Sequence, residues 1–185
     1  MTSTDSTDST DSTASTDGMR IAVAADNAGV ALKDALAAQL RADTRVAEVS
    51  DFGVPDESDD RPYPQLGLAA AQAVADGHAD RAVLVCGTGI GMAISANKVE
   101  GIRATVAHDS YSAERSIRSN DCQVLCMGGR VIGPELAKKI VDEWLGYEFD
   151  PSSASATKVA QIAEFERDHE TTSETTSETT SGGAR

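Results

Sequence analysis

A single cysteine is followed by closely spaced glycines in the segment VLVCGTGIGMAISANK, residues 83–98. The glycines are Gly87, Gly89 and Gly91, with Thr88 between the first two. Alternating glycines after a strand let the backbone approach a ligand closely and aim several N–H groups at one point. A helix predicted from Gly89 to Lys98 would add the positive end of its dipole. This segment therefore predicts a site for an anionic group next to Cys86.

Cys86 could act as a base in this environment, because amide donors and a helix dipole favour the thiolate form of a cysteine. A thiolate that faces a cluster of amide donors suits enolate chemistry: the sulfur removes a proton from carbon and the N–H groups hold the oxyanion. Asp26, and His108 with Asp109, also stand at predicted strand ends. They are candidates for further polar contacts, although Asp109 could equally cap a helix.

Three other interpretations of Cys86 stay open from these residues alone. A dinucleotide site would use the glycines, but GTGIG lacks the G-x-G-x-x-G spacing and follows the third predicted strand instead of the first. A phosphocysteine carrier would resemble components of the sugar-transport phosphotransferase system, in which the cysteine normally follows the first strand; here Asp26 would repel a phosphoryl group. The third interpretation is a cysteine that only packs in the core and is followed by a simple turn.

Strands and helices alternate along the chain. Apolar runs predict strands at residues 19–26, 46–51, 81–86, 102–109 and 122–129, and helical patterns cover residues 30–40, 66–77, 89–98, 111–118 and 134–145. Strands that are apolar throughout indicate a parallel sheet with both faces covered. With right-handed crossovers we expect a doubly wound, Rossmann-like α/β fold, a three-layer sandwich around a five-stranded parallel sheet.

In such folds the ligand crevice lies beyond the carboxyl ends of the strands, near a topological switch. Asp26, Cys86 and His108 end three of the predicted strands and should therefore meet at one edge. An extra C-terminal helix, with Val159 and Ile162 on its apolar face, follows the complete sheet. It needs a surface to pack on, and a partner subunit would supply one.

The two ends of the chain repeat Ser-Thr-Asp and Glu-Thr-Thr-Ser and have too few apolar side chains to offset the entropy of ordering. We therefore expect disordered tails at 1–18 and 168–185 around one domain at 19–167. The tails carry half of the formal net charge of −14, which leaves −7 on the domain. An acidic domain without a Lys/Arg cluster argues against nucleic acid and anionic membranes as partners.

The three cysteines and the start of the chain bear on the compartment. The number of cysteines is odd, and the sequence does not open with a basic stretch followed by an apolar run. We therefore expect reduced thiols in a cytoplasmic protein. Cys122 and Cys126 lack a second ligand pair for zinc and are expected to be buried strand residues. No segment approaches the ~20 apolar residues of a membrane span.

Several motifs together carry a family resemblance: AADNAG, Tyr63-Pro64, CGTGIGMAISANKVEGIRA and SNDCQVLCMGGRVIG. From about Met19 to Glu166 the chain resembles the ribose-5-phosphate isomerase B and galactose-6-phosphate isomerase (LacA/LacB) family. The resemblance implies aldose–ketose isomerisation of a small phosphorylated sugar through a cis-enediolate, with no metal and no organic cofactor. It also implies a homodimer or dimer of dimers with sites shared between subunits. Some members are non-catalytic sugar-phosphate-binding subunits that lack the base, and Cys86 argues against that role here.

The resemblance also implies roles for individual residues. Cys86 would move the proton between C1 and C2 while backbone groups of residues 87–91 hold the enediolate oxygen. Thr88 and Asp26 would contact substrate hydroxyls. The predicted substrate-binding residues are Asn27, Tyr63, Gly87, Gly89, Gly91, His108, Asn120, Arg130 and Lys158.

Departures from the family pattern bear on the substrate. Ser119 stands where the ribose-phosphate enzymes usually have a histidine that helps to open the furanose ring. Asn27 replaces the histidine of a DHAG motif, and ASATK replaces a phosphate cluster of the form Arg-His-x-x-Arg, leaving Lys158 as its cationic member. His108 could take over the role of the missing histidine from another strand.

Loss of a ring-opening group has a chemical explanation. Ribose 5-phosphate closes to a furanose through its free O4, whereas a tetrose 4-phosphate has O4 esterified and would need a four-membered ring to close through O3. The segments AHDSYSAERS and FDPSSASATKV also look like the tetrulose-phosphate isomerase branch of the family. We therefore expect D-erythrulose 4-phosphate and D-erythrose 4-phosphate as the substrate pair, with ribose 5-phosphate as the alternative.

Overall fold

The computed structural model describes residues 18–179. Its strands are β1 (Met19–Ala25), β2 (Val46–Asp51), β3 (Arg81–Cys86), β4 (Ala104–Val106) and β5 (Val124–Gly128). Its helices are α1 (Val30–Ala42), α2 (Tyr63–Ala75), α3 (Ile90–Ala96), α4 (Ser110–Arg118), α5 (Pro134–Leu145) and α6 (Ala156–Thr179). Residues 1–17 of the predicted N-terminal tail and residues 180–185 lie outside the described part of the chain.

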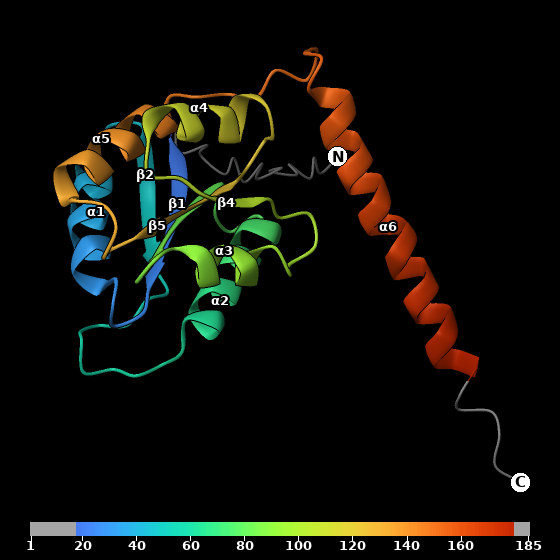
Figure 1. Ribbon diagram of the computed structural model, residues 1–185, viewed down its shortest axis with the longest axis horizontal. Helices are drawn as coiled ribbons and strands as arrows, with labels where there is room; N and C mark the ends of the chain where they lie inside the picture. The colour runs from blue at the N-terminus through green and yellow to red at the C-terminus, as the bar shows by residue number, and fades with distance from the viewer. Residues whose placement is uncertain (1–17, 180–185) are drawn as a thin grey trace, which may run out of the picture.

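The strands form one parallel sheet in the order β2-β1-β3-β5-β4. Helices α1, α4 and α5 pack on one face of the sheet and α2 and α3 on the other (Figure 1). This confirms the predicted Rossmann-like three-layer sandwich. The sheet is covered on both faces, and β3 shows the consequence: Val83 and Val85 join one apolar core and Leu84 joins the other.

The topological switch lies between β1 and β3. From β1 the chain crosses through α1 to β2 on one side, and then returns to place β3 on the other side of β1. The connections that leave the carboxyl ends of β1 and β3 therefore diverge to opposite faces of the sheet. A crevice opens between them, as expected for this class of fold.

Some element boundaries differ from the prediction for identifiable reasons. α2 begins at Tyr63, ahead of the apolar pattern that starts at residue 66, and Tyr63-Pro64 is itself a helix-start signal, because Pro64 occupies the first turn, where its missing N–H has no helical partner to lose. The strand predicted at residues 102–109 is confined to β4, at the edge of the sheet. Beyond it, Asp109 turns away from the sheet and accepts a hydrogen bond from the Ser112 N–H, which confirms it as the N-cap of α4.

The last helix is longer than predicted and runs along the outside of the sandwich, where its Glu166 carboxylate accepts the Gly101 N–H at 3.1 Å, before its far end extends beyond the sandwich (Figure 1). It continues through residues 168–179, where the sequence suggested the start of a disordered tail. Extending an existing helix adds one hydrogen bond for each residue that is fixed, whereas starting one is unfavourable. The apolar turns of α6 that precede residue 168 therefore supply a start from which the polar repeat continues.

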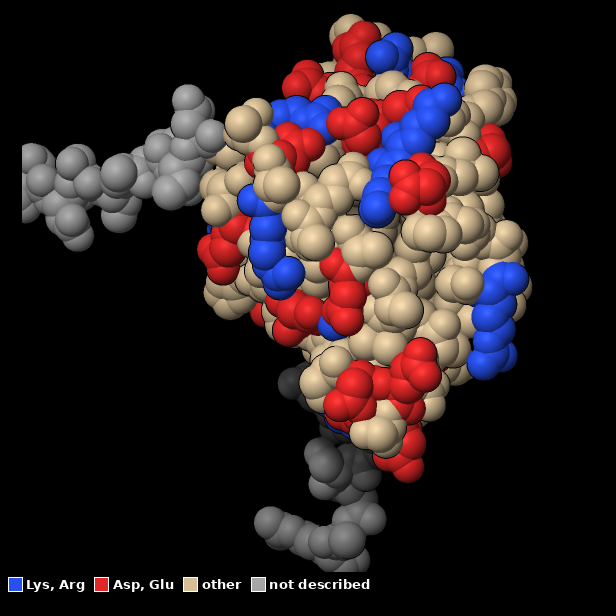
Figure 2. Space-filling model, turned by 90° about the vertical axis from the view of Figure 1, so that its left-hand side faces the viewer, with Lys and Arg blue, Asp and Glu red and all other residues tan. Residues whose placement is uncertain are grey.

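Charges of both signs are mixed on the face of the molecule shown in Figure 2. Lys and Arg side chains lie beside Asp and Glu there, and they do not gather into one continuous positive patch. That face therefore offers no extended cationic surface to a polyanion. Within residues 18–179, no helix combines the length and the apolar character that crossing a membrane requires.

Candidate active site

Asp26 and Cys86 come together because β1 and β3 are neighbours in register. Ala25 lies opposite Val85, so the following residue of each chain segment, Asp26 and Cys86, reaches the same level at the carboxyl edge of the sheet. On the other side of β3, Cys86 pairs with Gly128 of β5. The cysteine thus ends a central strand that is held on both sides.

The turn after Cys86 depends on a glycine at position 89. Gly89 has φ of +80°, and a Cβ at that position would lie 2.9 Å from the carbonyl carbon of Met127 in β5. The close approach lets the Gly89 N–H donate a hydrogen bond to the Cys86 Sγ at 3.1 Å. An amide donor at this distance stabilises negative charge on the sulfur.

The loop after β5 carries Arg130 to the same turn. Its backbone N–H donates to the Gly87 carbonyl at 3.1 Å, and the Gly129 N–H donates to the Cys86 carbonyl at 2.8 Å. The Arg130 side chain lies over Gly87, with its Cδ 3.6 Å from where a Cβ of residue 87 would be. A cation is therefore held beside the glycine turn, where it can bind a phosphate or an oxyanion.

Tyr63 reaches the turn from the other side. It is the first residue of α2, and its ring occupies the space that Gly91 leaves open. A Cβ on Gly91 would lie 2.5 Å from Cε2 of the ring. The glycine therefore sets where the tyrosine lies.

These groups surround a cleft of about 550 Å³. Its walls are Asp26, Asn27, Ala28, Tyr63, Cys86, Gly87, Thr88, Ile90, Gly91, Ile94 and Arg130. The volume is in the range of small-molecule sites. Cys86 is 4% exposed, so its sulfur lies at the floor of the cleft. Most of the predicted site residues are thus brought to one place.

His108 has a different set of contacts. Its Nε2 accepts a hydrogen bond from the Gly128 N–H at 2.8 Å, and it does not line the cleft. Burial lowers the pKa of His108, and the nearby Asp109 carboxylate offsets only part of that effect. The imidazole is therefore neutral at pH 7, with its proton on Nδ1, and supports the end of β5.

Asn120 and Lys158 are also remote from Cys86 within one chain. Asn120 follows α4 and precedes β5, and its side-chain amide donates to the Arg115 carbonyl at 3.0 Å. It therefore lies at the amino-terminal edge of the sheet, opposite the edge that holds Cys86. There it lines a second cavity, of about 430 Å³. Lys158 is an exposed residue in the first turn of α6.

Two apolar residues of the cleft, Ile90 and Ile94, were not predicted from the sequence. They are 56% and 59% exposed and lie one turn apart on α3. The available signal was their spacing, i and i+4, on the helix face opposite the buried Met92 and Ala96.

Within residues 18–179, the other cysteines and the remaining acidic groups do not form a metal centre. Cys122 and Cys126 are buried, as predicted, and burial raises the pKa of Cys122 to about 11. The pKa of Cys126 is also raised, chiefly by burial. In the part of the chain that the structure describes, no three His, Cys, Asp or Glu side chains gather in a way that could hold a metal ion.

Comparison with known proteins gives the family. A family model described as Ribose/Galactose Isomerase matches residues 21–162. The chain is 57% identical over 148 residues to D-erythrulose-4-phosphate isomerase 2 of Mycolicibacterium smegmatis, covering 80% of this chain and 97% of the relative. It is 44% identical over 148 residues to D-erythrulose-4-phosphate isomerase of Pectobacterium atrosepticum, covering 80% and 95%. The solved structure of ribose-5-phosphate isomerase B from Clostridium thermocellum superposes with a TM-score of 0.77 at 43% identity, covering 82% of this chain and 99% of the other. The chain belongs to the ribose/galactose isomerase family of sugar-phosphate isomerases.

Proposed function

We propose that this isomerase interconverts D-erythrulose 4-phosphate and D-erythrose 4-phosphate, with Cys86 as the catalytic base. The observation that carries the proposal is the Cys86 sulfur at the floor of the cleft, hydrogen-bonded to the Gly89 N–H. Two relatives that share 57% and 44% identity with this chain bear the name of that activity. Arg130 beside the turn supplies a cation for the phosphate or the oxyanion.

The reaction in this geometry moves one proton between two carbons. The Cys86 thiolate takes a proton from C1 of the ketose, the C1–H electron pair forms the C1–C2 double bond, and the carbonyl electrons move onto O2. The O1 proton then passes to O2, and the thiol returns its proton to C2, which gives the aldose and restores the thiolate. Asp26 and Thr88, which line the same cleft, contact the hydroxyls between which the second proton moves.

The contacts of His108 support an open-chain substrate. A ring-opening catalyst must exchange a proton with the ring oxygen, but the Nε2 lone pair of His108 accepts the Gly128 N–H. By the family resemblance, Ser119 stands at the position where the ribose-phosphate enzymes usually have a ring-opening histidine. A tetrose 4-phosphate cannot form a furanose, so it needs neither group.

We further propose a homodimer with sites shared between subunits. Asn120 and Cys86 lie at opposite edges of the same sheet, so Asn120 can contact a substrate at Cys86 only from a second copy of the chain. Lys158, on the outlying α6, would come from the second copy as well. The exposed Ile90 and Ile94 at the cleft give the interface an apolar surface to cover.

We also propose that the protein is cytoplasmic. Three free cysteines fit a reducing compartment and support the cytoplasm as the location.

Steady-state kinetics test the substrate and the base together. D-Erythrulose 4-phosphate, ribose 5-phosphate and a hexose 6-phosphate are compared for wild type, Cys86→Ala and the matched control Cys122→Ala. We expect the tetrulose phosphate to have the highest kcat/KM, Cys86→Ala to lose about 10³-fold or more, and Cys122→Ala to keep its activity. A far higher kcat/KM for ribose 5-phosphate would replace the proposed substrate by the alternative that the Clostridium structure favours.

Two further measurements separate the remaining alternatives. In D₂O, wild type should incorporate deuterium at C2 of the aldose while Cys86→Ala does not. Acid-labile phosphate on Cys86 without turnover would instead identify a phosphocysteine carrier, and tight substrate binding without turnover would identify a non-catalytic subunit. Sedimentation at several concentrations tests the dimer, which a monomeric active enzyme would contradict.

A further inference from the structure

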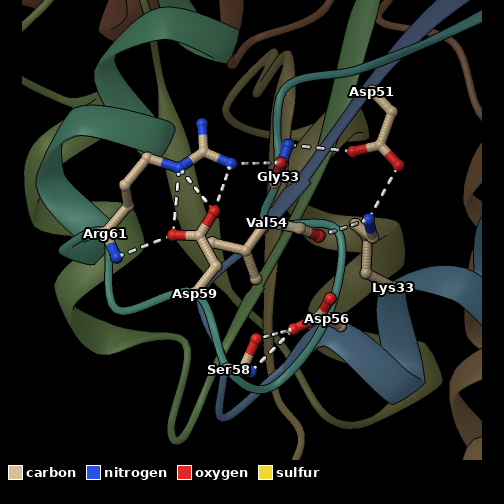
Figure 3. A network of polar contacts seen from close by, with 8 residues as sticks. All are labelled: Lys33, Asp51, Gly53, Val54, Asp56, Ser58, Asp59 and Arg61. Atoms are coloured by element: carbon tan, nitrogen blue, oxygen red, sulfur yellow. Dashed lines mark hydrogen bonds and ion pairs between the residues drawn. The ribbon is translucent and has the colours of Figure 1, made fainter.

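A lysine is buried beside the cleft without lining it. Lys33 of α1 is 3% exposed, which is rare for a lysine unless its charge is paired. Its Nζ donates to the Asp51 carboxylate at 2.7 Å and to the Val54 carbonyl at 3.1 Å (Figure 3), and it forms an ion pair with Asp34 at 3.1 Å. Two hydrogen bonds and two neighbouring carboxylates therefore pair the buried ammonium group.

These partners hold one end of the loop at residues 52–62, which joins β2 to α2. The Asp51 carboxylate also accepts the Gly53 N–H at 2.8 Å. The Val54 N–H donates to the carbonyl of Ala25, the last residue of β1, at 2.9 Å. A Cβ on Gly53 would lie 2.9 Å from Cδ of Lys33, so the loop backbone lies directly on the lysine.

The other end of the loop is held by Arg61, two residues before Tyr63. Its Nη2 donates to the Gly53 carbonyl at 3.3 Å and its Nε to both oxygens of Asp59, at 3.1 and 3.0 Å (Figure 3). Arg61 and Lys33 therefore bind the carbonyls of two consecutive residues, 53 and 54, from the two ends of the loop. The chain then enters α2 through Tyr63, whose ring packs on Gly91 at the cleft.

We propose that Lys33 is a positioning residue that acts with Arg61 to fix the loop at 52–62 and thereby sets Tyr63 against Gly91 in the cleft. The proposal rests on the proposed function, because it takes the cleft at Cys86 as the catalytic site. A lysine is required because a side chain of similar length without charge, such as methionine, leaves the Asp51 carboxylate and the Val54 carbonyl without their donor. The loop can then move, and Tyr63 moves with it.

The expected effects follow from how strongly each residue holds the loop. A displacement of about 1 Å at a reacting site can cost about 10²-fold in rate. We expect Lys33→Met to lower kcat/KM by about 10- to 100-fold, and Arg61→Gln, whose side chain is 47% exposed, by about 3- to 10-fold. Because Arg61 is exposed, its replacement leaves the protein folded even if Lys33→Met does not fold.

A double-mutant cycle with Tyr63→Ala separates positioning from general destabilisation. If Lys33 and Arg61 act through Tyr63, their replacement in the Tyr63→Ala background lowers kcat/KM by no more than about twofold. The matched control is Arg20→Met, which removes an ion pair with Asp80 (2.6 Å) at the opposite end of β1 and should change kcat/KM by less than about twofold in either background.

A failure of the positioning role of Lys33 can be distinguished from a failure of the proposed function. The positioning role would be overturned if Lys33→Met and Arg61→Gln lost as much kcat/KM in the Tyr63→Ala background as in wild type. It would also be overturned if neither variant lost kcat/KM in the wild-type background. In both cases an inactive Cys86→Ala would leave the proposed function in place. Retention of activity by Cys86→Ala would overturn the proposed function itself. The assay uses the full chain and the sugar phosphate with the highest kcat/KM for wild type.

Discussion

Replacing Gly89 with alanine would push a methyl group into the backbone of β5. The new Cβ would lie 2.9 Å from the Met127 carbonyl carbon and 3.1 Å from the Met127 nitrogen and oxygen, atoms of a buried strand that cannot move aside. The φ of +80° adds the penalty of a left-handed conformation, about 1–2 kcal/mol. Overpacking adds about 1–3 kcal/mol. We therefore expect Gly89→Ala to lower the free energy of unfolding by about 2–5 kcal/mol.

Gly77 provides a matched control for this substitution. It has φ of +72°, but a Cβ there would meet no atom within 4 Å. Gly77→Ala should therefore lower the free energy of unfolding by the conformational penalty alone, about 1–2 kcal/mol. The difference between the two variants isolates the close approach of the Gly89 turn to β5. Urea unfolding followed by circular dichroism measures both free energies.

The same pair of variants links the turn to catalysis. Alanine at position 89 displaces the N–H that donates to the Cys86 sulfur at 3.1 Å, so kcat should fall by about 10-fold or more, whereas Gly77→Ala should keep its kcat. Equal destabilisation of the two variants, or an unchanged kcat for a folded Gly89→Ala, would show that the glycine turn does not shape the site.

Three further predictions concern other groups near the site. Burial lowers the pKa of His108, so the unfolded chain binds this proton at a higher pH than the folded protein. The free energy of unfolding should therefore fall as the pH drops below about 6.5. Urea titrations of His108→Gln should show a smaller decline. Iodoacetamide at about pH 8 should label Cys86 before Cys122, whose pKa burial raises to about 11; peptide mass spectrometry showing the reverse order would contradict the site. Gly91→Ala should displace the ring of Tyr63 and lower kcat/KM by about tenfold, with little change in the urea midpoint because the ring is partly exposed; an unchanged kcat/KM would exclude a role for the ring.

Much of the fold was predictable because the strands of a doubly wound sheet are buried on both faces. The bounds of β3 were predicted correctly, since its run of apolar residues is preceded by the charged Asp80 and Arg81 and followed by Gly87. β4 was predicted too long because it lies at the edge of the sheet, where pairing on one side supports a shorter strand. The length of α6 was missed because its polar repeat has no apolar pattern from which a helix could be predicted.

For the candidate site, the residues that could do chemistry were easier to predict from the sequence than the contacts that bring them together. Cys86, the glycines and Asp26 stand at strand ends, and parallel strands bring their carboxyl ends to one edge. His108 could not be assigned from its position, because its role depends on the hydrogen bond that its Nε2 accepts from β5. Lys33 gave no signal, because a lysine in an amphipathic helix is normally exposed.

Residue types and their places along the chain indicate which groups are available for chemistry: a thiol, a glycine turn and a carboxylate, each encoded by local residue type and by the end of an apolar run. The fold establishes which of them share a cleft, because that depends on strand order, on register and on contacts between residues far apart in the chain. It placed Tyr63 on Gly91 and tied the loop before it to Lys33, while it left Asn120 at the opposite edge of the sheet. Side-chain type sets what a group can do, whereas packing sets its neighbours.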